Sequence, residues 1–262
     1  MSAAQAFAEL VRIMERLRAP GGCPWDREQT RRSIKPYVIE EAYEVAEAID
    51  DDNIDDLRAE LGDLLLQVVF HAEMAREESL FTIEDVVRGI SEKLIRRHPH
   101  VFADTTVKDS AEVLRNWARI KQEERKGRED NSVLSGVPRA MPALLRAHRL
   151  GEKAAGVGFD WNDASAVLDK VYEEVAELRA AIAQGDGDAV EAELGDVLFA
   201  LASLGRHFDL PAEDALQRAS DRFIRRFRAI EQRLADRQQD VHVTSAEELN
   251  QLWEAVKRDE RA

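Results

Sequence analysis

Residues 170–201 read KVYEEVAELRAAIAQGDGDAVEAELGDVLFAL, and this stretch decides how the rest of the chain is interpreted. The sequence Gly-Asp-Gly-Asp at 185–188 separates two stretches of helical character, which predicts two antiparallel helices joined by a short turn. The first helix would carry Glu174 and Glu177, and the second Glu193 and Asp196. Each pair is spaced i,i+3, so its members lie on adjoining parts of one helix surface. The hairpin is therefore expected to bring several carboxylates together.

The surroundings of these acids favour a metal site. After Asp196 the chain continues as VLFALASL, which is apolar on nearly all sides and predicts a buried segment. Carboxylates at such a place are costly unless they are paired, protonated or bound to a cation. Both helices offer only oxygen ligands, which suit Mg²⁺ or Mn²⁺. The alternative is that each acidic pair is simply the polar face of an amphipathic helix.

The same pattern occurs twice in the chain. Residues 37–72 read YVIEEAYEVAEAIDDDNIDDLRAELGDLLLQVVFHA, and five of their acids lie 133 positions before a counterpart in the later stretch. Unrelated polar faces would not keep this register. A possible second metal site is therefore predicted at Glu41, Glu44, Glu60 and Asp63, with Glu40 matching Glu173.

Further segments extend the duplication. IEDVVRGISEKLIRR at 83–97 matches AEDALQRASDRFIRR at 212–226, and NWARIKQEE at 116–124 matches LWEAVKRDE at 252–260. The sequence thus predicts an all-α protein made of two four-helix units. The predicted division is a first repeat at 1–125, a linker with a short helix at 126–160, and a second repeat at 161–262.

Composition narrows the function. The chain has 262 residues and a formal net charge of −15, which argues against a nucleic-acid-binding surface. Its single cysteine fits a reducing compartment, and no apolar run reaches the length of a membrane-spanning helix. We expect a cytoplasmic protein without nucleic-acid or membrane partners.

Basic side chains form a second functional signal. Arg222, Arg225 and Arg226 are spaced i, i+3, i+4 and form one cationic stripe on a helix. Arginine presents a planar fork that fits phosphate oxygens, although pairing with surface acids would explain the stripe equally well. Trp253 and Lys257, one turn apart, fit a nucleotide base and its phosphates, while a core position for Trp253 stays open.

The duplicated EExxE and ExxD pattern, with GFDW at 158–161 and RRHPHVF at 96–102, resembles the MazG family of nucleoside triphosphate pyrophosphohydrolases over essentially the whole chain. The resemblance implies an all-α homodimer whose bundles are completed by dimerisation. It also implies Mg²⁺-dependent hydrolysis of nucleoside triphosphates to monophosphate and pyrophosphate, with nucleotide-pool house-cleaning as a biological role.

The resemblance also implies roles for individual residues. The Mg²⁺ ligands would be Glu174, Glu177, Glu193 and Asp196, and Glu173 would orient or deprotonate the attacking water, which makes these five the catalytic residues. Nucleotide, including ATP, would be held by Lys170, Arg222, Arg225, Arg226, Trp253 and Lys257.

The two repeats differ where a nucleotide would bind. Tyr37 stands in the place of Lys170, and Pro99 is expected to end the basic helix of the first repeat just after Arg97. We therefore predict that the second repeat is the main catalytic one. Two alternatives remain open: a dUTPase-like hydrolase, and a metal-stabilised helical regulatory or interaction module without turnover.

Overall fold

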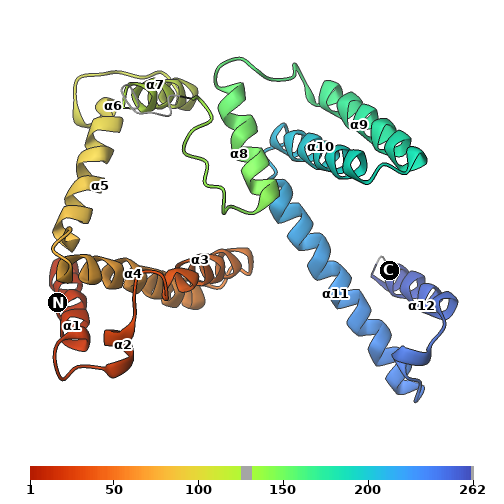
Figure 1. Cartoon of the computed structure of the whole chain (residues 1–262), viewed down its shortest axis with the longest axis horizontal. Coiled ribbons are helices and arrows are strands. Elements are labelled where there is room, and N and C mark those ends of the chain that lie inside the picture. The colour runs from red at the N-terminus through yellow and green to blue at the C-terminus, as the bar shows by residue number, and fades with distance from the viewer. Residues whose placement is uncertain (125–131, 261–262) are drawn as a thin grey trace. The chain divides into compact units, whose positions relative to one another are not determined.

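The computed structural model describes residues 1–124 and 132–260 and contains helices but no strands in these ranges (Figure 1). The all-α prediction is confirmed. The chain divides into two compact units, Met1–Asp109 and Ser110–Ala262. The boundary predicted at 125–126 lies outside the described residues. The described helices include none that combines the length and apolar character needed to span a lipid bilayer.

The first unit contains the two hairpin helices and the basic helix expected for the first repeat, whereas the helix expected at 116–124 lies in the second unit as α7. Its elements are α1 (Ala3–Arg18), α2 (Pro24–Glu28), α3 (Lys35–Asp50), α4 (Ile54–Glu77), α5 (Ile83–Arg97) and α6 (Pro99–Phe102). Helix α5 begins with a capping box, in which Thr82 and Asp85 satisfy each other's backbone N–H groups. It ends at Arg97, as the sequence predicts from Pro99, because proline cannot supply the N–H that continues a helix.

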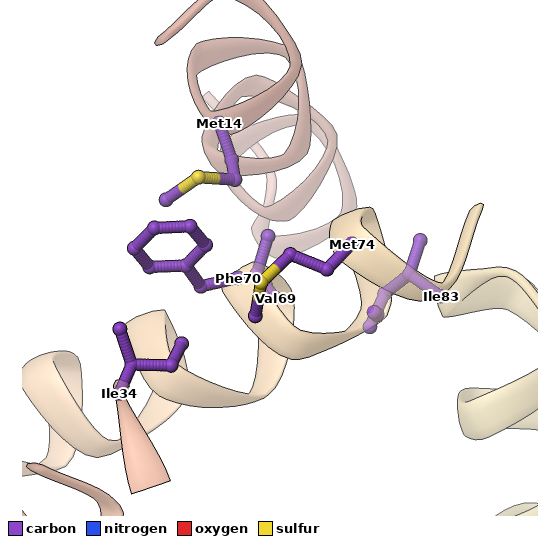
Figure 2. Close-up of a cluster of buried hydrophobic side chains, with 7 residues drawn as sticks. Met14, Ile34, Val69, Phe70, Met74 and Ile83 are labelled. Carbon is purple, nitrogen blue, oxygen red and sulfur yellow. The ribbon is translucent and has the colours of Figure 1, made fainter. Parts of the chain in front are cut away.

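The core of the first unit lies where α1 crosses α4. Figure 2 shows Met14 of α1 facing Phe70 of α4, with Ile34, Val69, Met74 and Ile83 around them. Arg18 covers this cluster: its guanidinium lies 5.4 Å from the centre of the Phe70 ring and donates two hydrogen bonds, of 2.8 and 2.7 Å, to Glu77. The core therefore fixes α4, the helix that carries Glu60 and Asp63.

The second unit repeats the hairpin and extends it. Its elements are α7 (Ser110–Glu123), α8 (Ala143–Ala155), α9 (Ala164–Gln184), α10 (Gly187–Arg206), α11 (Ala212–Asp236), a 3₁₀ turn (Val241–Val243) and α12 (Ala246–Asp259). Helices α9 and α10 pack along each other, and α12 packs on α11 through a core of Ile230, Leu234, Leu252 and Val256.

Both hairpin turns use the same local conformation. Gly185 ends α9 with φ +71°, and Asp186 then caps α10 by accepting hydrogen bonds from the N–H groups of Asp188 and Ala189. In the first repeat Asp52 takes φ +52° and Asn53 caps α4. Positive φ reverses the chain tightly after a helix, so each turn sets the register in which the acids of its two helices face each other.

The segment after Asp196 is less buried than its sequence suggests. Val197, Ala200, Ala202 and Ser203 are buried, but Leu198, Phe199 and Leu201 are 40–43% exposed. Our prediction of burial on nearly all sides is therefore wrong for the single chain, because α8 and α9, the helices that pack most extensively on α10, leave these three side chains partly uncovered.

Helix α11 leaves α10 through a tight turn at Gly205. A Cβ at this position would lie 2.5 Å from the carbonyl oxygen of Leu210, closer than real contacts allow. Two further contacts tie the neighbouring segments together: Arg206 donates two hydrogen bonds to Asp160, and the backbone N–H of Leu145 on α8 donates to Glu213 of α11.

The buried Phe70 ring generates a stability prediction. We expect Phe70→Ala to lower the free energy of unfolding of the first unit by about 3–5 kcal/mol, because truncation leaves a cavity beneath Arg18. Hydrogen exchange of peptides from residues 1–109 in increasing urea measures this loss. Phe102→Ala, at a side chain that is 59% exposed, is the control and should change the value by less than about 0.5 kcal/mol. Equal losses in both variants would contradict the prediction.

Candidate functional site

The hairpin of α9 and α10 brings three predicted metal ligands together. Glu174 and Glu177 of α9 and Glu193 of α10 each offer a carboxylate oxygen, and these oxygens all lie within 4.8 Å of one another. Glu174 is buried, Glu193 is half-buried and Glu177 is exposed. The group therefore has one side held inside the hairpin and one open to solvent. Asp196 lies one helical turn beyond Glu193 and outside this group.

Lys170 supplies positive charge to the same cluster. Its ammonium donates a 2.7 Å hydrogen bond to Glu173 and lies 2.7 Å from an oxygen of Glu174. Hydrogen bonds to these two carboxylates raise the pKa of Lys170 far above its ordinary value. The lysine therefore stays charged and offsets part of the negative charge that the hairpin gathers.

The remaining negative charge affects the pKa of Glu177. Partial desolvation and then the charges of Glu174 and Glu193 raise the pKa of Glu177, against a smaller lowering by Lys170. Carboxylates so close together favour either a shared proton or a cation. The donor set fits a hard divalent ion, because it consists of carboxylate oxygens with one open side.

The first repeat has the matching cluster with different neighbours. Glu41, Glu44 and Glu60 also offer oxygens within 4.8 Å of one another. Desolvation, followed by the charge of Asp63, raises the pKa of Glu41, and desolvation followed by Glu44 raises that of Glu60. Asp63 itself lies outside the three-acid group, one turn beyond Glu60.

Sequence reasoning missed Gln67 of α4. Its side chain is buried at the first cluster, and its Nε2 lies 3.5 Å from Glu41. The signal was present in the alignment of the two repeats, because the matching position in the second repeat is Ala200.

Apart from Lys170, the predicted nucleotide-binding residues form a separate group on α11 and α12. The guanidinium of Arg226 lies 5.6 Å from the centre of the Trp253 ring, and the ring of Phe223 lies 5.2 Å from it between centroids. Trp253 is half-buried rather than a fully covered core residue. One aromatic face and one arginine thus lie together, as a base and its phosphates would require.

Acidic residues already pair with several of these cations. Glu260 accepts a 2.8 Å hydrogen bond from Arg226 and a 3.4 Å bond from Arg225, and these bonds lower the pKa of Glu260. Lys257 donates to Glu254 at 2.8 Å, while Arg222 is exposed. Sequence reasoning did not identify Glu260, because its pairing depends on how α12 packs against α11.

The structure does not join the two groups. In residues 1–124 and 132–260, the acids of the α9–α10 cluster form no hydrogen bond or ion pair with the cations of α11 and α12. The acidic cluster and the arginine and tryptophan group are therefore two separate groups, the first on α9 and α10 and the second on α11 and α12.

Comparison with known proteins identifies the pattern. The family model described as the MazG nucleotide pyrophosphohydrolase domain matches twice, at residues 29–102 and 163–230. Both matches contain a helical hairpin with its acidic cluster. These features define an all-helical class of nucleotide pyrophosphohydrolases.

Individual proteins are also similar to nearly the whole chain. A nucleoside triphosphate pyrophosphohydrolase of Escherichia coli strain K12 is 49% identical over 254 residues, covering 96% of this chain and 97% of its own. The nucleoside triphosphate pyrophosphohydrolase/pyrophosphatase MazG of Thermotoga maritima is 46% identical, covering 96% of this chain and 95% of its own. The uncharacterized protein YabN of Bacillus subtilis is 44% identical over 97% of this chain but only 52% of its own length. The chain belongs to the MazG family.

The raised pKa of Glu177 generates a prediction about metal-free stability. A carboxyl whose pKa is higher in the folded than in the unfolded chain binds its proton more tightly when folded. Its stabilising contribution is therefore present below the unfolded value of 4.5 and is lost as pH rises through the folded pKa. We expect Glu177→Gln to raise the melting temperature at pH 7.5 in EDTA, and this gain to shrink as pH falls to 4.5.

Thermal melting across this pH range measures the effect. The control is Glu191→Gln, at an exposed residue of α10 outside the cluster. A gain from Glu177→Gln that is the same at every pH would show that repulsion among the ionised acids is not its cause.

Proposed function

We propose that the second repeat hydrolyses nucleoside triphosphates to nucleoside monophosphate and pyrophosphate. The observation that carries this proposal is the convergence of Glu174, Glu177 and Glu193 beside Lys170. The names of the relatives that match nearly the whole chain support the same reaction. Broad use of bases is expected, because a tryptophan face stacks on any base.

Mg²⁺ is the proposed cofactor, with Mn²⁺ as a substitute. Glu174, Glu177, Glu193 and Asp196 would hold it through carboxylate oxygens, the ligands that these hard ions prefer. When bound, the ion lowers the pKa of a water molecule and offsets charge on the phosphates. The exposed side of the cluster, at Glu177, leaves room for that water and for substrate.

The chain's own residues supply the remaining parts of the reaction. Glu173 is exposed beside the cluster and would accept the proton of the attacking water as its oxygen bonds to the α phosphorus. The bond from that phosphorus to the bridging oxygen breaks, and the electron pair leaves with pyrophosphate. Lys170, which spans Glu173 and Glu174, is placed to offset charge that grows on the phosphates.

Nucleotide binding is proposed for the group on α11 and α12. Trp253 would stack on the base, while the phosphates would be held by Arg222, Arg225, Arg226 and Lys257. In this proposal the triphosphate displaces Glu260 from Arg225 and Arg226, because it offers more negative charge to the same two guanidinium groups. Substrate thus bridges the two groups.

We further propose a homodimer acting in the cytoplasm. Leu194, Leu198 and Leu201 expose apolar surface along α10, and a second copy of the chain would cover it. The single cysteine fits a reducing compartment.

Product analysis tests the reaction. The purified chain is incubated with each common nucleoside triphosphate, dUTP and dITP, with and without Mg²⁺, and monophosphate, diphosphate, pyrophosphate and phosphate are resolved. We expect monophosphate and pyrophosphate from several triphosphates, and only with the metal. Diphosphate and phosphate would overturn the proposed site of attack. Turnover of dUTP alone would establish the dUTPase-like alternative.

Matched substitutions test which repeat acts. We expect Glu177→Ala to lower kcat at least about 100-fold, because a metal ligand beside the reacting phosphate is lost. Glu44→Ala, the same change at the matching position of the first repeat, should leave kcat within about twofold of the unaltered chain. A large loss of kcat in Glu44→Ala, with kcat nearly unchanged in Glu177→Ala, would show that the first repeat is the catalytic one.

A further inference from the structure

We infer that Glu260 is an internal competitor of the substrate: its carboxylate occupies the place of a phosphate between Arg225 and Arg226, and it thereby limits how tightly nucleotide and pyrophosphate bind. The inference rests on the nucleotide site proposed above and adds a residue that regulates the affinity of that site. Glu260 would hold no ligand itself. Its removal should therefore strengthen binding, whereas removal of a residue that holds the ligand weakens it.

The two arginines bind the carboxylate of Glu260 as they would bind a phosphate group. Nε of Arg226 donates a 2.8 Å hydrogen bond to Oε2, and Nη2 of the same residue lies 2.7 Å from that oxygen. The other oxygen, Oε1, accepts a 3.4 Å hydrogen bond from Arg225. Phosphate oxygens accept hydrogen bonds from guanidinium groups in the same way, so carboxylate and phosphate compete for this place.

The register of α12 explains why Glu260 lies at the site. Trp253, Lys257 and Glu260 are spaced i, i+4, i+7, so they share one face of the helix. This is the face on which the Trp253 ring meets the guanidinium of Arg226, at 5.6 Å. The side chain of Arg226 is only 23% exposed. Helix α12 therefore holds Arg226 at two points, by a ring and by a carboxylate.

The ion pair is present at neutral pH and is still open to displacement. The hydrogen bond from Arg226 lowers the pKa of Glu260, against a smaller increase from desolvation, so the carboxylate stays ionised. Two features keep the pair weak. Glu260 follows the last turn of α12, where the helix dipole disfavours negative charge, and the side chains of Arg225 and Glu260 are 66% and 28% exposed. A triphosphate carries more negative charge than one carboxylate and can take its place.

Attachment to the same pair of helices makes Glu260 an effective competitor. A tethered group acts at an effective concentration on the order of millimolar or higher. Because the carboxylate must leave before a phosphate binds, it weakens the binding of every ligand that uses Arg225 and Arg226. The pyrophosphate released by the proposed reaction is one of these ligands, so Glu260 also favours its departure.

Binding of ligands that are not turned over tests the inference. The full chain and its variants are titrated by calorimetry with α,β-methylene-ATP and, separately, with inorganic pyrophosphate, both in the presence of Mg²⁺. We expect Glu260→Gln to lower both dissociation constants about fivefold, which is what a partly exposed ion pair contributes. The matched control is Asp259→Asn, which removes the same charge at the neighbouring position, where the partner is Arg233. It should leave both constants unchanged.

A further variant ties the effect to the arginine. The gain from Glu260→Gln should shrink in a chain that carries Arg226→Ala, because the main contested group is then absent. Equal melting temperatures exclude unfolding as the cause of any change.

Three results would overturn the inference. Unchanged or weaker binding in Glu260→Gln would show that the carboxylate does not compete, and weaker binding would mean that it orients the arginines for the ligand. An equal gain in Asp259→Asn would show that total charge is the cause. Binding that is insensitive to Arg226→Ala would overturn the proposed nucleotide site as well, whereas a loss in Arg226→Ala without a gain in Glu260→Gln overturns the inference alone.

Discussion

Carboxylates held close together between two helices are the constraint on which the rest of this structure depends. The turn at Gly185 and Asp186 reverses the chain so that Glu193 faces Glu174 and Glu177 across the hairpin. Partial desolvation, followed by repulsion from Glu174 and Glu193, raises the pKa of Glu177, and this repulsion opposes the packing that brings the groups together. The apolar contacts of α9 and α10 must outweigh that repulsion in the metal-free chain. A function that needs a cation is therefore consistent with the way the helices are packed.

The two repeats place different residues beside these closely spaced carboxylates. In the second repeat the counter-charge comes from Lys170, which lies within 2.7 Å of oxygens on both Glu173 and Glu174. In the first repeat the same backbone turn, through Asp52 and Asn53, gathers the matching acids, with Tyr37 at the position of Lys170. The two repeats thus share the same helical hairpin but differ in the charge of the residue beside their acidic clusters.

Much of the fold could be predicted from the sequence because its boundaries have local causes. Pro99 ends α5, Gly185 ends α9, and the 133-residue register pairs the acids without reference to any contact. Tertiary contacts set the rest. The exposure of Leu198 and Phe199 depends on which helices cover α10, and the pairing of Glu260 with Arg226 depends on how α12 packs. The separation of the acidic cluster from Trp253 likewise follows from the direction in which α11 leaves α10, which no local pattern encodes.

The turn between the two helices is close-packed at Gly205, where no space remains for a Cβ beside the carbonyl of Leu210. A change of angle at this turn displaces the residues far along α11. Arg226 lies about 20 Å along it at 1.5 Å per residue, so a change of 10° at the turn would move this guanidinium by about 4 Å. Such a displacement exceeds a hydrogen-bond length. A residue with a Cβ at position 205 would force this turn to shift, and the shift would be carried along α11 to its arginines.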